Sequence, residues 1–447
     1  MLNENREQRI PKRVALHTLG CRLNLAETDA IRRRLEAAGY QVVPWGQEAE
    51  LCVLNSCTVT QQSGAKSRRA LLGIRRKYPD AQLAVVGCYA QLAGESLAEA
   101  GLADLIIGNG EKLKLDEFLP ALEGRTKPLV VRPPISRKGF RMDVPAGQTG
   151  TTRAHLKVQD GCDFMCSFCI IPSVRGRARA RQPDDLMQEA QGLVETGTKE
   201  LVLTGVNVGT YREAGRSLEQ VVDQLDRLPG LARIRISSIE PTTVATGLLE
   251  RMGDPGHRLV PFLHLPLQSG SGRTLQSMRR RYTPEAYRSF AERALDLVPG
   301  LCLGTDVMAG FPAEDAAAFA ETVRFLEGLP FAYFHVFPYS SRKGTPAARR
   351  LDHVAAGEIK RRTAILRALS DAKRLAYQGR FIGHTLTVLF EQPKRLNLAQ
   401  GYTENYLRVE VNAPEATALR NRILSVRLTR SGDRGNLATM HGELARP

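Results

Sequence analysis

The sequence predicts an α/β protein in three parts: an N-terminal open parallel α/β domain, a central partial (β/α)6 barrel and a small C-terminal β module. Short apolar runs rich in β-branched residues alternate with helical patterns over the first ~125 residues and again over about 152–377, which is typical of parallel sheets. The final ~70 residues carry short strand patterns separated by turns. A length of 447 residues suits two or three domains.

The N-terminal domain is placed at 12–125. Strands are expected at 14–19, 51–55, 83–87 and 104–108, with helices from about 26 to 38 and from the second strand to about 78. Residues 126–151 contain several prolines and glycines and little periodicity, which predicts a linker.

Cys21, Cys57 and Cys88 each fall just past the end of a predicted strand. The carboxyl ends of parallel strands share one edge, where ligands usually bind, so we expect these thiols to be neighbours and to hold a metal cluster. Three unrelated loop cysteines remain the alternative. Cys52 and Cys302 lie inside apolar strand patterns and are expected to be core residues.

The central domain, at 152–377, has strand patterns at 154–159, 200–206, 233–237, 260–267, 302–309 and 331–338. Helix patterns lie between them, one beginning near Pro183 and another after Ser217. Six βα units predict a partial barrel. The loop after its first strand would lie at the C-terminal mouth, where such barrels place active sites.

That loop holds Cys162, Cys166 and Cys169 in a Cys-x3-Cys-x2-Cys spacing. A zinc site and a [4Fe–4S] cluster each take four ligands, so three cysteines leave one cluster corner open for a substrate or cofactor. Three thiols cannot all pair as disulfides. Iron–sulfur is the favoured interpretation, with zinc as the alternative.

The net charge of +16 and the pI near 9.7 indicate a polyanionic partner such as RNA, although a merely basic enzyme would look the same. Eight cysteines in a chain of this length fit a reducing cytoplasm rather than a disulfide framework. We expect no signal peptide and no membrane span. Three basic clusters are candidate phosphate contacts: the arginines of 175–181, those of 279–281, and Lys66, Arg68 and Arg69.

The cysteine loop, with the flanking strings at 157–161 and 170–172, resembles the radical S-adenosylmethionine (SAM) enzymes, and within them the methylthiotransferases. The strings around Cys21, Cys57 and Cys88 resemble the N-terminal domain of the same family, and residues 401–406 resemble a TRAM domain. This resemblance implies two [4Fe–4S] clusters, one bound by each triad. SAM would chelate the open iron beside Cys162, and a small RNA-binding β-barrel would form at 378–447.

The resemblance also nominates residues that hold SAM. They follow the second, third and fourth barrel strands: Gly205, Asn207, Ser238, Glu240 and Gln268. Glu240 would accept a hydrogen bond from a ribose hydroxyl. Asn207 and Glu240 could equally be turn or capping residues. One of the arginines near the mouth would hold the SAM carboxylate.

Residues 20–24 and 159–163 look most like the MtaB branch of the family. That branch converts N6-threonylcarbamoyladenosine beside the tRNA anticodon (position 37) to its 2-methylthio form. Methylthiolation of isopentenyladenosine in tRNA or of a ribosomal-protein aspartate is the alternative. A zinc-stabilised RNA-binding protein without catalysis is the alternative from another class.

The expected partners are the tRNA anticodon arm and a flavodoxin-like or ferredoxin-like electron donor, acting on a cytoplasmic monomer. Arg408, Arg427 and Arg430 are candidate phosphate contacts of the C-terminal module. We expect a chain truncated near Gln378 to keep both clusters and to bind tRNA less tightly.

Overall fold

The computed structural model describes residues 12–147, 151–393, 395–432 and 439–445. They form two compact units. One comprises the chain up to 136 together with 142–146 and 173–176, and the other comprises the remainder. Residues 148–150 of the predicted linker, and 394, 433–438 and 446–447 of the predicted C-terminal module, lie outside the described residues.

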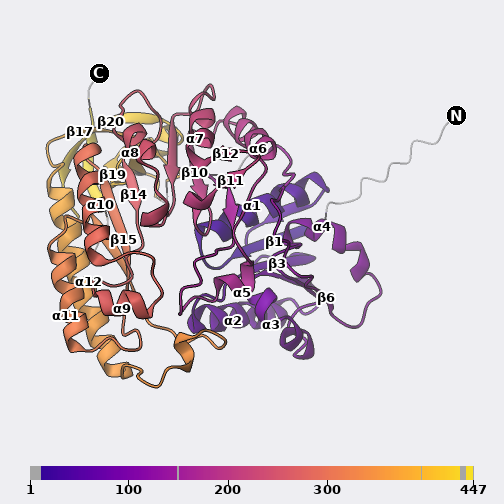
Figure 1. Cartoon of the computed structure of the whole chain (residues 1–447). Coiled ribbons are helices and arrows are strands. Elements are labelled where there is room, and N and C mark those ends of the chain that lie inside the picture. Colours follow the sequence, from indigo (N-terminus) through magenta and orange to yellow (C-terminus); the bar gives the residue numbers. More distant parts are fainter. Residues whose placement is uncertain (1–11, 148–150, 394, 433–438, 446–447) are drawn as a thin grey trace. The chain divides into compact units, whose positions relative to one another are not determined.

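The N-terminal unit contains a six-stranded parallel sheet in the order β2-β1-β3-β4-β5-β6 (Figure 1). Its strands are β1 Arg13–Thr18, β2 Gln41–Val43, β3 Leu51–Ser56, β4 Gln82–Gly87, β5 Leu105–Ile107 and β6 Leu129–Val131. Its helices are α1 Arg22–Ala37, α2 Gln61–Lys77, α3 Cys88–Glu99 and α4 Leu115–Phe118. The predicted open parallel α/β fold is therefore confirmed.

Successive residues of these strands enter different cores, because side chains alternate across a sheet. Val53 packs with α1 and α4, whereas Leu54 packs with α2 and α3 on the other face. Cys52 is fully buried in the second core, as expected. A sheet covered on both faces explains why its strands read as continuous apolar runs.

The sequence reasoning missed β6, which lies inside the predicted linker. Leu129–Val131 pairs in parallel with β5 and extends the sheet. This run of three apolar residues stands between Pro128 and Pro133, so the prolines concealed it. The three-residue strand β2 was missed for the same reason of length.

The second unit begins with six parallel strands that follow the chain: β7 Arg153–Lys157, β10 Glu200–Thr204, β13 Arg233–Ile236, β14 Phe262–His264, β15 Cys302–Ala309 and β16 Tyr333–Pro338. They form the sheets β13-β10-β7 and β14-β15-β16, and a bridge from Ile234 to Leu259 links β13 to the segment that enters β14. The predicted partial barrel is confirmed. Strand β14 is shorter than expected, because Pro261 and Pro266 bracket it and lack backbone N–H groups.

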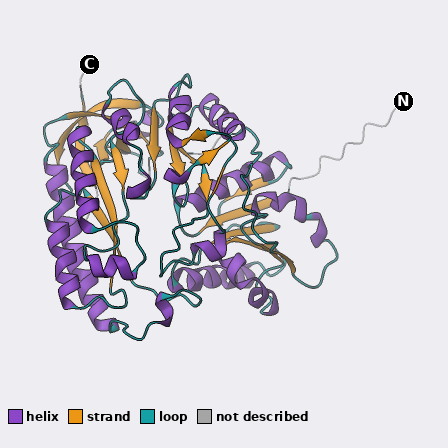
Figure 2. Ribbon diagram, viewed as in Figure 1, coloured by secondary structure: helices purple, strands orange, loops and turns teal. Residues whose placement is uncertain are grey.

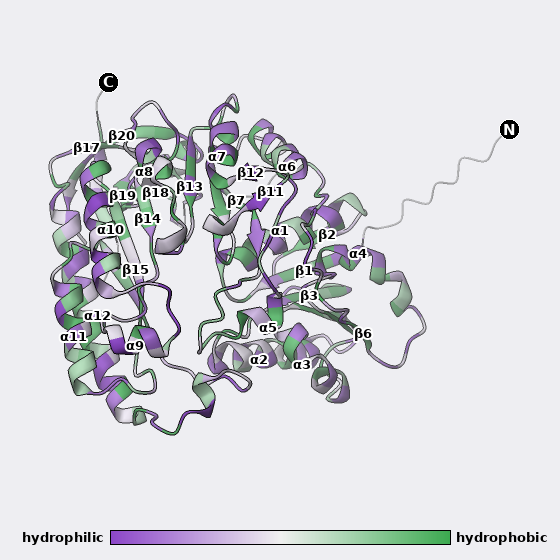
Figure 3. Cartoon of the chain, viewed as in Figure 1, coloured by the Kyte–Doolittle hydropathy of each residue, from purple (hydrophilic) through white to green (hydrophobic). Residues whose placement is uncertain are grey.

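Helices connect these strands and cover them (Figure 2): α6 Pro183–Glu195, α7 Leu218–Asp226, α8 Thr246–Gly253, α9 Gly272–Ser277, α10 Pro284–Leu297, α11 Ala316–Glu327 and α12 Ala356–Gly379. The short elements are α5 Ile171–Arg175 and the antiparallel pairs β8 Gln159–Asp160 with β9 Arg179–Ala180 and β11 Arg212–Glu213 with β12 Arg216–Ser217. Helices α11 and α12 alternate between hydrophobic and hydrophilic colouring (Figure 3), as expected when one face meets a sheet.

The inner face of the half-barrel is polar. Leu203, Ile234 and Leu303 point outward into the core shared with the helices. The alternate positions therefore face inward, and they are mainly charged or polar: Arg153, His155, Lys157, Glu200, Thr204, Arg233, Arg235, His264 and Asp306. A lumen lined in this way is suited to polar ligands and not to an oily core.

The C-terminal module is a closed five-stranded barrel in the order β17-β18-β19-β21-β20. Its strands are β17 Thr385–Phe390, β18 Leu398–Thr403, β19 Arg408–Asn412, β20 Ile423–Arg430 and β21 Thr439–Leu444. The predicted small β-barrel is confirmed, although β18 and β21 were not predicted. Gly401 is required at its position, because a Cβ there would lie 2.3 Å from the carbonyl oxygen of Leu389.

This barrel covers the N-terminal ends of the half-barrel strands. Arg235 donates to the carbonyl oxygen of Glu404 at 2.8 Å, and Phe262 and Cys302 join the apolar core of the C-terminal barrel. Cys302 is buried, as the sequence predicts. None of the helices in the described part of the chain is long and apolar enough to cross a membrane.

Candidate metal centres and cofactor loops

The first candidate centre lies at the carboxyl edge of the N-terminal sheet. Cys21 caps α1 after β1, Cys57 directly follows β3, and Cys88 begins α3 after β4. These strands are neighbours, and the charges of Cys21 and Cys88 influence each other. A Cβ on Gly20, whose φ is +114°, would lie 3.0 Å from Sγ of Cys57. The structure therefore brings the three cysteines together.

A buried charged network adjoins this triad. Glu27 pairs with Arg175 at 3.0 Å and with Lys112 at 2.5 Å, and all three side chains are at most 1% exposed. Asn109 accepts from Lys112 at 2.7 Å, and its Nδ2 lies 3.5 Å from Sγ of Cys88. Two cations and one carboxylate leave an excess of positive charge, which suits an anionic group held by thiolates.

The second candidate centre is the loop of Cys162, Cys166 and Cys169. The charges of the three thiols influence one another, and the backbone N–H of Cys169 donates to the carbonyl oxygen of Cys166 at 3.1 Å. Burial raises the pKa of Cys169 to about 12. This thiol stays protonated near neutral pH unless a metal displaces its proton.

Neither triad is gathered as tightly as a mononuclear site. In the described parts of the chain, the one group of three His, Cys, Asp or Glu ligand atoms within 4.8 Å of one another is His264, Asp306 and His335. The sulfurs of a tetrahedral zinc site stand only about 3.8 Å apart, given Zn–S bonds of about 2.3 Å. Wider spacing fits a multi-iron cluster, so the residues present are compatible with the implied group.

Gln159 ties the cysteine loop to the next loop of the mouth. Its side-chain oxygen accepts from the backbone N–H groups of Val206 and Asn207, each at 2.9 Å, and its amide donates to the carbonyl of Gly161 at 2.8 Å. A Cβ on Gly205 would lie 2.9 Å from that side-chain oxygen, so glycine permits the close approach. The sequence reasoning gave Gln159 no role, although it stands three residues before Cys162.

Asn207 retains an unused donor. Its side-chain oxygen accepts from Thr243 at 3.1 Å, while its buried Nδ2 has no hydrogen-bond partner in the described part of the molecule. A buried donor without a partner is costly, so this atom is suited to a ligand acceptor such as a carboxylate or hydroxyl.

Glu240 occupies a different setting from the one predicted. Arg280 donates to its Oε2 at 2.5 Å and also contacts Sγ of Cys166 at 3.3 Å. Burial raises the pKa of Glu240, and the charge of Arg280 opposes that effect. One carboxylate oxygen is therefore committed to Arg280, which links it to the cysteine loop.

The remaining candidates also lie at the ends of strands. Ser238 is half-buried just after β13. Gln268 has a φ of 71° and is fixed by two backbone hydrogen bonds to β15, with Asp306 at 2.8 Å and Met308 at 2.9 Å. Gly205, Asn207, Ser238, Glu240 and Gln268 thus follow β10, β13 and β14 at the same end of the half-barrel as the cysteine loop.

The prediction of surface basic clusters is wrong for three arginines. Arg175 is 1% exposed, Arg181 is buried against Asp185 and Glu189, and Arg280 is enclosed by Glu240 and Tyr282. Sequence proximity could not separate these buried ion pairs from solvated arginines. By contrast, Lys66, Arg68 and Arg69 on α2 are exposed, as are Arg427 and Arg430 on β20, while Arg408 is half-buried and bonds Gln400.

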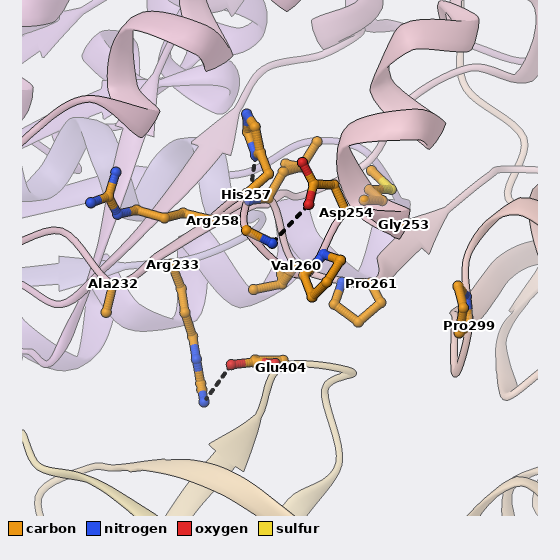
Figure 4. A pocket seen from close by; sticks show the side chains of 14 residues that line it. Ala232, Arg233, Gly253, Asp254, His257, Arg258, Val260, Pro261, Pro299 and Glu404 are labelled. Atoms are coloured by element: carbon orange, nitrogen blue, oxygen red, sulfur yellow. Dashed lines mark hydrogen bonds and ion pairs between the residues drawn. The ribbon is translucent and has the colours of Figure 1, made fainter.

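A cavity of about 410 Å³ lies away from all of these residues (Figure 4). It is lined by the segment from Met252 to Pro261, by Arg233 at the start of β13 and by Glu404 of the C-terminal barrel. It therefore lies at the N-terminal ends of the strands. Barrel enzymes place their chemistry at the opposite end.

Comparisons with known proteins agree with this geometry. Residues 13–108 match the family described as Uncharacterized protein family UPF0004, and residues 156–326 match the Radical SAM superfamily. The threonylcarbamoyladenosine tRNA methylthiotransferase MtaB of Bacillus subtilis (strain 168) is 37% identical over 428 residues, covering 94% of each chain. The chain belongs to the radical SAM methylthiotransferases. Within that family it is most like the MtaB branch.

A second kind of methylthiotransferase relative is nearly as similar. The tRNA-2-methylthio-N(6)-dimethylallyladenosine synthase of Ruegeria pomeroyi is 33% identical over 445 residues, covering 97% of this chain and 99% of the relative. The radical SAM methyltransferase TsrM from Kitasatospora setae aligns with a TM-score of 0.55 at 16% identity over 76% of this chain and 77% of TsrM, which shows a shared fold. Membership of the radical SAM superfamily implies SAM and a [4Fe–4S] cluster.

Proposed function

We propose that this methylthiotransferase acts on tRNA and converts N6-threonylcarbamoyladenosine beside the anticodon to its 2-methylthio derivative. The observation that carries the proposal is the pairing of two separate three-cysteine centres with relatives whose names specify this nucleoside. The excess of basic residues, a net charge of +16, suits an RNA substrate.

In this proposal the two triads hold different clusters. Cys162, Cys166 and Cys169 bind the cluster that SAM completes, and Cys21, Cys57 and Cys88 bind an auxiliary cluster. When bound, the first cluster and SAM supply a carbon radical, and the second supplies the route for sulfur. The excess positive charge of Arg175 and Lys112 over Glu27 would offset the negative charge of the auxiliary thiolates.

Residues of the mouth then hold SAM. The free Nδ2 of Asn207 supplies a hydrogen-bond donor, and Gly205 keeps the backbone close to the cysteine loop. Arg280 is shared between Cys166 and Glu240, so it fixes the loop in place and is a weaker candidate for the SAM carboxylate than the sequence suggests.

A dimethylallyladenosine substrate is the second candidate, because relatives of that name are 33% identical over nearly the whole chain. The two substrates differ in chemistry: the threonylcarbamoyl group carries a carboxylate, whereas the dimethylallyl group is an apolar hydrocarbon. They can therefore be separated by direct assay.

The test is anaerobic turnover of the reconstituted full-length protein with SAM, a chemical reductant and anticodon-arm RNAs carrying either nucleoside. Digested RNA is analysed by nucleoside mass spectrometry. We expect the 2-methylthio product from the threonylcarbamoyl RNA. Product from the dimethylallyl RNA alone would assign the second candidate, and a colourless zinc protein forming neither product would contradict both.

A further inference from the structure

A polar cluster on the inner face of the half-barrel has no place in the scheme above. Asp306 on β15 accepts hydrogen bonds at Oδ1 from Nε2 of His264 at 3.0 Å and from Nδ1 of His335 at 3.2 Å. The hydroxyl of Tyr333 lies 3.1 Å from the other ring nitrogen of His264. Three adjacent parallel strands thus supply one connected cluster.

The cluster is rigidly built. His264 is 5% exposed, and both of its ring nitrogens are engaged. Tyr333 reaches across β15 because Gly304 has no side chain, since a Cβ there would lie 2.4 Å from the tyrosine ring. Burial would raise the pKa of Asp306, but the two imidazoles outweigh it and hold this pKa well below its usual range. The carboxylate is therefore ionised, and the imidazole nitrogens that face it carry protons.

His335 leaves part of its ring accessible. Its side chain is 53% exposed, and Phe337, the next inner-face residue of β16, is 44% exposed. Their ring centroids are 6.3 Å apart in an edge-to-face arrangement. Because Nδ1 of His335 is bound to Asp306, its Nε2 is directed away from that carboxylate. The inner face of β16 thus offers an oriented imidazole beside an exposed phenyl ring.

Resting on the proposed function, we infer that His335 and Phe337 bind the modified nucleoside. His335 receives the carboxylate of the threonylcarbamoyl group, and Phe337 packs against the base. As an imidazolium, His335 donates from Nδ1 to Asp306 and from Nε2 to the substrate, and a charge-assisted hydrogen bond of this kind is strong. Aromatic side chains are the usual platform for an unstacked RNA base. A dimethylallyl group offers nothing for this imidazolium to bind.

The position along β16 fits this role. Tyr339 follows the strand, its ring centroid lies 5.7 Å from that of Phe311, and Phe311 lies 6.3 Å from Phe168 of the cysteine loop. His335 precedes Tyr339 by four residues, about 13 Å of extended chain. A substituent anchored at His335 leaves the base on the side of the lumen that leads to Cys166 and Cys169.

Binding of three anticodon-arm RNAs to the reconstituted full-length protein tests this inference. The RNAs carry N6-threonylcarbamoyladenosine, its methyl ester or unmodified adenosine, so their phosphates are identical. Fluorescence anisotropy is measured for the wild type, His335→Ala, His335→Gln and Asp306→Asn. His384→Ala, an exposed histidine of the same unit, is the matched control.

We expect the wild type and the control to bind the acid about tenfold more tightly than the ester, as one charge-assisted contact allows. In His335→Ala and His335→Gln this preference should fall below about twofold, while the affinity for unmodified RNA is unchanged. Asp306→Asn should weaken the preference in the same direction, because it removes the charge that orients and stabilises the imidazolium.

An undiminished acid preference in His335→Ala would overturn the inference. So would the loss of one bound zinc or iron ion on that substitution, because the cluster would then be a metal site. Turnover separates the two proposals. Product from threonylcarbamoyl RNA with an unchanged KM in His335→Ala sinks this inference alone, whereas no such product from the wild type sinks the proposed function.

Discussion

Arg233 donates a hydrogen bond of 2.9 Å to the backbone carbonyl of Tyr402 and thereby joins a half-barrel strand to the C-terminal barrel. The same guanidinium donates to the carbonyl of Thr387 at 2.9 Å. Arg153 pairs with Glu391 at 2.7 Å and lies over the ring of Tyr402. The C-terminal barrel therefore supplies acceptors for arginines that the half-barrel would otherwise bury without partners.

The first prediction concerns truncation. The sequence suggested that a chain ending near Gln378 would keep both clusters, but the structure changes this expectation. Removing the barrel strips the apolar cover from Phe262 and Cys302 and leaves Arg233 and Arg235 without their carbonyl acceptors. We expect the truncated chain to aggregate or to melt at lower temperature, as scanning calorimetry and size-exclusion chromatography would show. A truncated monomer with the full-length Tm would contradict this.

The second prediction concerns pH. Burial would raise the pKa of Glu200, but Arg235, Arg153 and Arg233 outweigh it and hold this pKa below its ordinary value. A lowered carboxyl pKa adds stability that is present above the unfolded pKa, about 4.3, and is lost as pH falls through the folded pKa. Urea unfolding should therefore show the wild type weakening below about pH 4.

Glu200→Gln is the matched variant for this measurement. It should be less stable at pH 7 by about 3–5 kcal/mol, because buried arginines lose their counter-charge. Its stability should also change less with pH in the acid range, since the titrating group is gone. Parallel pH curves for the two proteins would show that Glu200 is not the group responsible.

The third prediction separates the cysteine triads. Anaerobic reconstitution should give about eight irons per chain, and replacing either whole triad by alanine should leave about four. Loss of Cys162, Cys166 and Cys169 should abolish 5′-deoxyadenosine formation. Loss of Cys21, Cys57 and Cys88 should leave some SAM cleavage but no methylthio product. Cys52→Ala is the control, because that thiol is buried in the sheet. Four irons or fewer in the reconstituted wild type would refute the two-cluster scheme.

The fourth prediction concerns RNA affinity. Arg427 and Arg430 are exposed on β20, so their replacement should not disturb the barrel core. If each contacts one phosphate, an Arg427→Gln/Arg430→Gln protein should show a log–log salt slope for tRNA binding that is shallower by about 1.4–1.8. Arg181→Gln is no suitable comparison, since that arginine is buried. Filter binding across a salt series decides, and equal slopes would place the phosphates elsewhere.

Much of this architecture was predictable because it depends on local patterns. Apolar strand runs located the sheet and the half-barrel, and the topology of parallel strands then placed Cys21, Cys57 and Cys88 at one edge. Strands of three residues such as β2 and β6 escaped, because their patterns are too short to rise above the neighbouring prolines.

The electrostatic partners were not predictable. Nothing in the local sequence reveals that Arg175 joins Glu27, 148 positions earlier, or that Arg280 joins Glu240. The cluster of His264, Asp306 and His335 escaped for the same reason, since its members come from three strands and only the register of the sheet unites them. Long-range pairing of charges depends on the finished fold.

The assignment of residues 173–176 to the N-terminal unit has a consequence for protein engineering. Arg175 stands six positions after Cys169, yet its partners Asn24 and Glu27 belong to the first helix of the chain. A chimera that takes residues 12–125 from a relative would import the acceptors without the guanidinium they evolved beside. Positions 24, 27 and 175 therefore form one hereditary set, and a successful graft must transplant them together.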